Sequence, residues 1–231
     1  MLLYRWWKSR NVKDSLQGGN RITHVGCSSH MTWYCLCSII TFSIPWKSRR
    51  NTLESSKRVM RYLKGTKNYK LTLRINHNSL LGYADVDWAS QDHRHSISVY
   101  IFQINGGSIS WSCQKQNIVT LSSTEAEFIV LTHAMKEALC LQHFITEVIQ
   151  PLKSPIRLYS DDQSAITITY GNQQHARTKY FDKWHYFLHD TIENSQIMIE
   201  YLPTKKMLAD ILTKGLPGPK VKSLVDKLGR Y

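Results

Sequence analysis

Acidic residues are nearly absent from the first third of this 231-residue chain. Residues 1–78 contain 15 Lys and Arg but only two acids, Asp14 and Glu54, whereas residues 79–231 contain 15 basic and 15 acidic side chains. The formal charge of +13 therefore lies entirely in the N-terminal third, where it would attract a polyanion. The neutral remainder would have to concentrate its acids locally to form an acidic site.

Paired cysteines and long hydrophobic runs are also lacking. The five cysteines show no paired framework, which excludes a disulfide-stabilised scaffold and fits a reducing compartment. Residues 1–10 lack the apolar segment of a signal peptide. The apolar stretch 31–46 has only 16 residues, with Thr, Ser and Pro inside it, which is short for a transmembrane helix. We therefore expect an intracellular protein that is neither secreted nor bound to a membrane.

Residues 1–50 show no pattern of a recognisable domain. Potential zinc ligands occur at His24, Cys27 and His30, followed by Cys35 and Cys37, but their spacing matches no common zinc finger. We therefore expect neither a zinc site nor a folded domain in this segment.

A short basic helix is predicted between Leu53 and Leu63, ended by Gly65. Its apolar residues share one side, and its basic residues lie on the others: Lys57, Arg58, Arg61 and Lys64. Such a helix either contacts a nucleic-acid backbone or is simply solvated, and the pattern favours neither. Residues 51–78 are therefore interpreted as a basic connection.

From Leu80 onward, short runs of β-branched and aromatic residues alternate with helical patterns. The predicted strands are 80–87, 97–104, 108–113, 156–160 and 197–202, and the predicted helices are 123–148, 163–170, 181–193 and 204–212. Asn105-Gly106-Gly107 indicates a hairpin between the second and third strands. Three antiparallel-looking strands followed by strand–helix alternation predict an α/β fold, with helices packed on a mixed five-stranded sheet.

The longest predicted helix begins with Leu-Ser-Ser-Thr-Glu-Ala-Glu at 121–127. Its apolar residues recur with the spacing of a core-facing helix, at 130, 131, 134, 138, 141, 145 and 148. One step back along this stripe lies Glu127, whereas Glu125 lies about 200° away, toward solvent. A carboxylate at the head of a buried stripe is costly unless a metal ion or a hydrogen-bond network pairs with it. Glu127 is therefore a candidate functional residue, and the simpler alternative is exposure at the helix end.

Four carboxylates fall at or near the ends of these elements. Asp85 lies near the end of the first strand, Glu127 in the first turn of the long helix, Asp161 after the fourth strand, and Asp210 among apolar residues of the last helix. Any one of them alone is most simply a surface acid. Together, hard oxygen ligands without a matching His/Cys cluster suit Mg²⁺ or Mn²⁺ rather than zinc. Two such ions would serve phosphodiester hydrolysis.

Four converging carboxylates would repel one another when no metal is bound. From the sequence alone, Asp210→Asn is therefore expected to leave the metal-free protein at least as stable as the wild type. The same substitution is expected to weaken metal binding.

Four motifs carry a family resemblance. They are Tyr-Ala-Asp-Val-Asp-Trp-Ala (83–89), Leu-Ser-Ser-Thr-Glu-Ala-Glu-Phe (121–128), Leu-Tyr-Ser-Asp-Asp-Gln-Ser-Ala-Ile (158–166) and Leu-Ala-Asp-Ile-Leu-Thr-Lys (208–214). In this order they resemble the ribonuclease H domain of copia-type retrotransposon Pol polyproteins. Segment 61–66, Arg-Tyr-Leu-Lys-Gly-Thr, resembles the connection that follows the reverse transcriptase in such polyproteins. Nothing in residues 1–50 resembles the polymerase itself.

The resemblance implies a ribonuclease H-like fold for residues 79–216, followed by a helical tail at 217–231. It implies an active site of four acids, Asp85, Glu127, Asp161 and Asp210, that binds two Mg²⁺ or Mn²⁺ ions and cleaves the RNA strand of an RNA–DNA hybrid endonucleolytically. The implied partners are the hybrid and the reverse transcriptase and integrase parts of a Pol polyprotein, in a cytoplasmic virus-like particle or in the nucleus. The candidate contacts to nucleic acid are Arg58, Arg61, Lys64, Ser123, Thr124, Gln163, Ser164, Arg177 and Lys179.

The chain departs from the family pattern at several positions. Val99 occupies the place of a usual Gly, and Tyr180 and Trp184 replace a usual His and Arg. The usual Tyr-His order is inverted at His185-Tyr186. Two other functions therefore stay open: a catalytically decayed remnant that only binds nucleic acid, and a different nuclease or strand transferase on the same fold.

Overall fold

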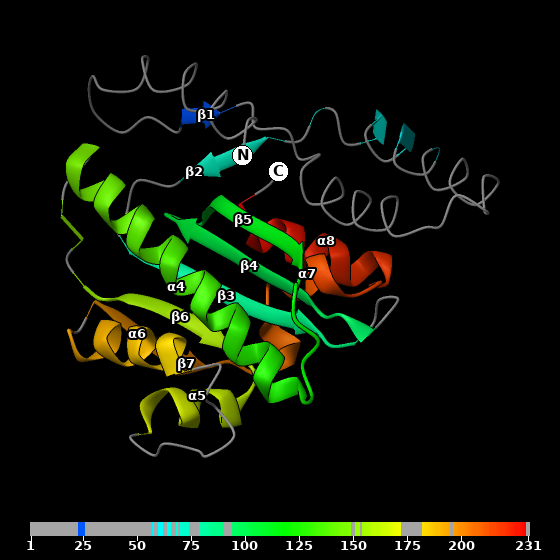
Figure 1. Cartoon of the computed structure of the whole chain (residues 1–231). Coiled ribbons are helices and arrows are strands. Elements are labelled where there is room, and N and C mark those ends of the chain that lie inside the picture. Colours follow the sequence, from blue (N-terminus) through cyan, green and yellow to red (C-terminus); the bar gives the residue numbers. More distant parts are fainter. Residues whose placement is uncertain are drawn as a thin grey trace.

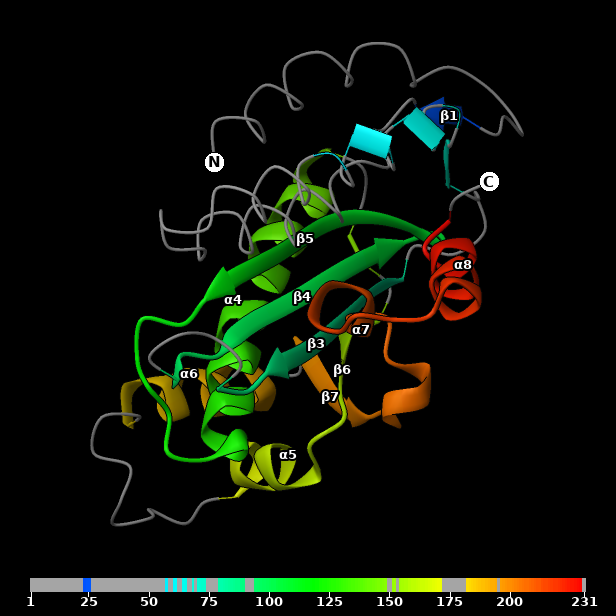
Figure 2. The same cartoon turned by 90° about the vertical axis from the view of Figure 1, so that its right-hand side faces the viewer.

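The computed structural model describes residues 79–89, 94–148, 151–152, 154–171, 182–194 and 196–229 (Figures 1 and 2). It also describes residues 23–25 and 70–73 and isolated positions between them, at 57, 60, 61, 64, 65 and 68. The centre of the molecule is a five-stranded sheet with helices on both faces.

The sheet is mixed. Its strands are β3 (Leu80–Asp87), β4 (Ile97–Ile104), β5 (Gly107–Lys115), β6 (Ile156–Ser160) and β7 (Ile197–Tyr201), in the spatial order β5-β4-β3-β6-β7. β4 is antiparallel to β3 and β5, whereas β6 is parallel to β3 and to β7. Asn105 and Gly106 join β4 to β5 with φ of 53° and 78°. Positive φ at both residues is what a two-residue hairpin turn requires to match the right-handed twist of its strands. This strand order confirms the predicted α/β, ribonuclease H-like fold.

Helix α4 (Ser123–Val148) covers one face of the sheet, flanked by α5 (Gln163–Tyr170) and α6 (Asp182–Glu193) (Figure 1). Its buried side chains follow the predicted stripe and include Val130, Ala134, Ala138, Leu141 and Ile145. The helical period seen in the sequence therefore marks the face that lies on the sheet. Within the described residues, no helix combines the length and the hydropathy that crossing a membrane requires.

The C-terminal segment covers the opposite face, with the 3₁₀ turn η2 (Thr204–Lys206), α7 (Asp210–Thr213) and α8 (Gly218–Lys227) (Figure 2). Five of its apolar residues are buried against Ile97, Val99 and Ile101 of β4: Met207, Leu208, Ala209, Ile211 and Leu212. Strand side chains alternate, so Tyr100 and Phe102 lie instead on the α4 side. Strand β4 is thus buried on both faces.

Most predicted bounds are confirmed, including those of β3, β4, β6, α4 and α5. β5 extends beyond 108–113 at both ends, α6 begins at 182, β7 ends at 201, and α8 forms within the predicted C-terminal tail. The single helix predicted at 204–212 is wrong, because Met207 has an extended backbone between η2 and α7. The extended break lets Met207, Leu208 and Ala209 all be buried, whereas a surface helix buries only one stripe.

In the N-terminal part, β1 (Thr23–Val25) pairs antiparallel with β2 (Leu71–Leu73), and Leu73 packs against the core on the α4 side. The other predictions for residues 1–50 lie outside the described residues. The described positions of the basic helix, Lys57, Met60, Arg61, Lys64 and Gly65, are helical and exposed. Gly65 is itself helical, and the residues that directly follow it lie outside the described residues.

Candidate active site

Asp85 lies inside β3, two residues before the strand ends, and is 2% exposed. Its Oδ2 accepts a hydrogen bond from the Thr213 hydroxyl of α7 at 2.5 Å, and Lys214 Nζ lies 3.5 Å from the same oxygen. Burial raises the pKa of Asp85 to about 6, although the Thr213 hydrogen bond and the Lys214 charge lower it. Asp85 is therefore a buried carboxyl group that becomes protonated in mild acid.

The start of α4 decides which of two glutamates is buried. Ser122 Oγ accepts the backbone N–H of Glu125 at 3.1 Å, and Glu125 Oε2 accepts that of Leu121 at 2.8 Å, much as in a capping box. Glu127 faces β3 and is 5% exposed, and its Oε1 accepts the N–H of Val86 at 3.2 Å. The predicted burial of Glu127 is confirmed, and the two glutamates have separate roles.

Asp161 follows the end of β6, and its Oδ2 accepts a hydrogen bond from the Thr204 hydroxyl at 2.7 Å. The adjacent Asp162 is instead the N-cap of α5. Its Oδ1 accepts the N–H groups of Ser164 and Ala165 at 2.7 and 3.0 Å. The two neighbouring acids thus have different roles: Asp162 caps α5, and Asp161 faces Asp85 and Glu127.

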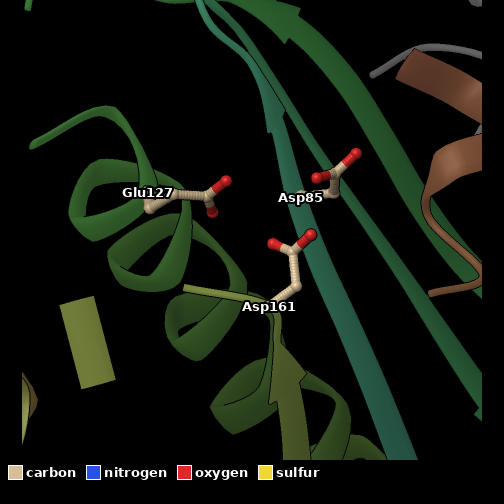
Figure 3. A group of neighbouring side chains, drawn as sticks. All are labelled: Asp85, Glu127 and Asp161. Atoms are coloured by element: carbon tan, nitrogen blue, oxygen red, sulfur yellow. The ribbon is translucent and has the colours of Figure 1, made fainter. Parts of the chain in front are cut away.

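Three of the four predicted acids converge. Asp85, Glu127 and Asp161 come from β3, α4 and the end of β6 and point toward one another (Figure 3). One carboxylate oxygen from each lies within 4.8 Å of the others. β3 and β6 are parallel neighbours, which brings Asp85 and Asp161 to the same end of the sheet. The structure therefore forms an acidic triad from residues that lie far apart in the sequence.

The triad fits a divalent cation. Oε2 of Glu127 is buried and has no hydrogen-bond partner among the described residues. A buried carboxylate oxygen without a partner is costly unless a cation or an ordered water meets it. Burial also raises the pKa of Glu127, as do the charges of Asp85, Asp161 and Asp162. Carboxylate oxygens are the ligands that Mg²⁺ and Mn²⁺ prefer, and a bound cation would relieve this repulsion.

Asp210 lies beside the triad but has its own cations. It is fully buried, with Lys214 Nζ 2.6 Å from Oδ1 and Lys220 Nζ 3.2 Å from Oδ2. Lys214 also contacts Asp85 and so links the two acids. Burial lowers the pKa of Lys214, but the hydrogen bond to Asp210 and the charges of Asp85, Asp210 and Asp161 leave it raised. The structure thus shows Asp210 as one half of an ion-pair network.

The candidate contacts to nucleic acid fall in three places. Ser123 and Thr124 lie at the start of α4 and Gln163 and Ser164 at the start of α5, and all four are exposed or half-buried. Arg61 and Lys64 are exposed in the N-terminal helical part. Arg58, Arg177 and Lys179 lie outside the described residues.

Three of the residues that depart from the family pattern, Val99, Trp184 and His185, pack against other parts of the structure, whereas Tyr186 is exposed. Val99 of β4 is fully buried under the C-terminal segment. Trp184 packs against the core, and its ring lies 6.5 Å from that of His133. His185 Nε2 lies 3.2 Å from the carbonyl oxygen of Ile168, and its ring stacks on Phe128 of α4. Trp184 and His185 thus connect α6 to α4 and α5. Tyr180 lies outside the described residues.

Four residues that contact the acids were not predicted as site residues from the sequence: Thr204, Thr213, Lys214 and Lys220. Thr213 and Lys214 end the motif at 208–214, so their proximity to Asp210 was visible in the sequence. Thr204 was interpreted only as a helix start, and no sequence pattern indicated Lys220. Their contacts depend on how the C-terminal segment packs on the sheet.

Comparison with known proteins yields relatives of two kinds. No protein-family model matches the chain. The chain is 34% identical over 179 residues to the retrovirus-related Pol polyprotein from transposon TNT 1-94 of Nicotiana tabacum, a match that covers 77% of this chain but 13% of the polyprotein. It is 46% identical over 90 residues to the secreted RxLR effector protein 161 of Plasmopara viticola, covering 38% of this chain and 63% of the effector. The chain thus spans a small part of the polyproteins that it matches.

Among solved structures, LC11-RNase H1 in complex with an RNA/DNA hybrid aligns with 58% of this chain. The alignment covers 93% of the solved chain, with 15% sequence identity and a TM-score of 0.44.

Proposed function

Because this chain is homologous to one segment of retrotransposon Pol polyproteins, as its motifs predicted, and has a ribonuclease H-like fold, we propose that it hydrolyses the RNA strand of RNA–DNA hybrids. The convergence of Asp85, Glu127 and Asp161 at one end of the sheet carries the proposal. The activity would serve reverse transcription of a copia-type element. The hybrid and the reverse transcriptase and integrase parts of a polyprotein would be its partners.

Asp85, Glu127 and Asp161 would hold Mg²⁺ or Mn²⁺, and Asp210 would complete a site for two ions. The ions would supply an activated water and would neutralise charge on the leaving oxygen. The chain itself orients the ligands, since Val86 donates its backbone N–H to Glu127 and two threonine hydroxyls donate to the aspartates. Cleavage would leave 3′-hydroxyl and 5′-phosphate ends.

Substrate choice would depend on the 2′-hydroxyl groups of the RNA strand, which distinguish RNA from DNA in the minor groove. The exposed or half-buried polar residues that open α4 and α5 lie within four residues of Glu127 and Asp161 in the chain, where they would contact this strand. The basic residues before position 79 would bind phosphates without regard to sequence.

The decisive experiment uses the full chain with a hybrid whose RNA strand is labelled. We expect internal cleavage of that strand with Mg²⁺ or Mn²⁺, no cleavage with chelator, and no cleavage of double-stranded DNA. Asp85→Asn and Asp161→Asn should each lower the rate by orders of magnitude, because each removes charge from the ion site. The matched control is Asp162→Asn, which alters the neighbouring acid but keeps a good N-cap for α5.

Two outcomes would contradict the proposal. Metal-dependent cleavage of double-stranded DNA at the same rate would assign another nuclease activity to the fold. Hybrid binding without cleavage under any metal condition would indicate a decayed remnant that only binds nucleic acid.

A further inference from the structure

Two threonines of the C-terminal segment each donate a hydrogen bond to one carboxylate of the triad. The Thr204 hydroxyl donates to Asp161 Oδ2 at 2.7 Å, and the Thr213 hydroxyl donates to Asp85 Oδ2 at 2.5 Å. The acceptors belong to different strands, and the donors flank one continuous segment, 204–213. One segment of the chain, whose residues are not members of the triad, thus donates hydrogen bonds to two of the three triad carboxylates.

The segment between these threonines is held in place by its own packing. Met207, Leu208 and Ala209 are at most 4% exposed, and they pack against β4 together with Ile211 and Leu212. At its start, the N–H of Leu202 donates to the carbonyl oxygen of Ser160 at 2.8 Å, one residue before Asp161. Core packing therefore determines the position of the Thr213 hydroxyl, and the Leu202 hydrogen bond anchors the chain two residues before Thr204.

A hydroxyl donor has a specific effect on a metal-binding carboxylate. It occupies one lone pair of one oxygen and limits rotation of the carboxyl group, so the remaining lone pairs point in a defined direction. Mg²⁺ demands nearly ideal octahedral geometry, so such orientation affects binding. Glu127 Oε2 is buried and has no hydrogen-bond partner in the described part of the chain, which indicates where the oriented carboxylates and a cation would meet.

We propose that Thr204 and Thr213 are positioning residues of the metal site, which hold Asp161 and Asp85 in the orientation that binds a divalent cation. The C-terminal segment 204–213 is then part of the metal site and does more than cover the sheet. The inference rests on the proposed function, because it assumes that the triad binds the catalytic metal. Its own readout is the affinity for the cation, which is measured without substrate.

The test uses the full chain with paired substitutions at each threonine. Thr213→Val and Thr204→Val keep the side-chain shape and remove the hydroxyl, whereas Thr213→Ser and Thr204→Ser keep the hydroxyl. Thr191→Val is the matched control, because Thr191 is 3% exposed and donates only within α6, to the carbonyl oxygen of Phe187. Mn²⁺ affinity is measured by calorimetry, the environment of bound Mn²⁺ by electron paramagnetic resonance, and folding by thermal melting in chelator.

We expect Thr213→Val to weaken Mn²⁺ binding about 10- to 100-fold, the usual effect of losing a residue that orients a metal ligand. Thr204→Val should weaken binding less, because Thr204 is exposed and water can replace its hydroxyl. Both serine variants and Thr191→Val should bind Mn²⁺ as the wild type does. On hybrid substrate, Thr213→Val should lower kcat and leave KM nearly unchanged.

Folded Thr213→Val with wild-type Mn²⁺ affinity would overturn the inference, and so would a serine variant as weak as its valine counterpart. If Thr213→Val does not fold, the exposed pair at Thr204 decides in the same way. A wild type without Mn²⁺ affinity would overturn the metal site itself. A third outcome separates the two proposals. If the wild type binds Mn²⁺ but cleaves no hybrid, and the valine variants bind Mn²⁺ more weakly, the positioning role is supported and the proposed function is overturned.

Discussion

Asp210 shows how the cations around one carboxylate decide the sign of its effect on stability. From the sequence, Asp210 was one of four mutually repelling acids, so removing its charge was expected to leave the metal-free protein at least as stable as the wild type. The structure places two lysine ammonium groups within 3.2 Å of its oxygens, in a fully buried position. We therefore expect attraction to Lys214 and Lys220 to outweigh repulsion from the triad.

Asp210→Asn should accordingly destabilise the metal-free protein by about 1–3 kcal/mol. This is less than for a fully buried pair, because both lysines are 39% exposed. Thermal melting in chelator should show a loss of several degrees. Asp226→Asn, which removes an exposed acid of α8, is the control and should melt with the wild type. If Asp210→Asn melted at or above the wild type, repulsion would dominate as the sequence alone suggested.

The pKa of Asp85 predicts how stability depends on pH. Burial raises this pKa from 3.8 to about 6 in the folded protein, so the unfolded chain releases the proton at lower pH. The contribution of Asp85 to the free energy of unfolding is therefore fully present below about pH 4. It is lost as the pH rises through about 6, and the total loss is about 3 kcal/mol. The raised pKa of Glu127 acts in the same direction.

Comparing the wild type with Asp85→Asn isolates this effect from other titrating groups. In chelator, the stability difference between the two proteins should shift in favour of Asp85→Asn as pH rises from 4 to 7, as measured by urea unfolding. Mg²⁺ should restore the wild type at pH 7, because it binds the deprotonated carboxylate. Parallel pH profiles for the two proteins in chelator would contradict the assignment.

At the scale of elements, the first turn of α4 links helix stability to the site. Ser122 and Glu125 satisfy backbone N–H groups that have no partner within the helix, and the resulting register buries Glu127. Gln116 joins the same region to β4, since its Nε2 donates to Ser98 Oγ at 2.8 Å and to the Ala126 carbonyl oxygen at 3.0 Å. The helix start is thus held by its cap and by the sheet.

Ser122→Ala should destabilise the protein by about 1 kcal/mol, the usual cost of removing an N-cap. The melting temperature should fall by about 2–4 °C for a domain of this size. Ser123→Ala, one residue along at an exposed position, is the matched control and should change the melting temperature little. Equal losses in the two variants would mean that Ser122 is not the cap.

For the molecule as a whole, the uneven charge separates affinity from catalysis. A chain of residues 70–231 retains Leu73, which packs against the core, and holds 17 Lys and Arg against 15 Asp and Glu. Compared with the full chain, it should bind hybrid with a flatter dependence on salt, because fewer cations displace counterions from phosphates. Its cleavage rate at saturating substrate should be nearly unchanged, because the triad is intact.

Filter binding across a salt series and single-turnover cleavage measure these two quantities. Equal salt slopes for the two chains would mean that residues 1–69 do not touch phosphates. A smaller reduction in slope is expected for the full chain with Lys57, Arg61 and Lys64 changed to Gln, since all three are exposed.

Local sequence determined most elements of this protein and three of its candidate ligands. The period of α4, the hairpin at Asn105-Gly106 and the β-branched runs each depend on residues close in the chain, so their bounds were predictable. The same period identified Glu127 rather than Glu125, and the motifs identified Asp85 and Asp161.

Only the tertiary structure decided how the C-terminal segment meets the site. Burial of Met207, Leu208 and Ala209 against β4 replaced the predicted helix with a turn, an extended break and a short helix. That path places Thr213 beside Asp85, which is 128 residues away in the sequence, and gives Asp210 two lysine partners. No local pattern reports such contacts, because they depend on packing between segments far apart in the chain.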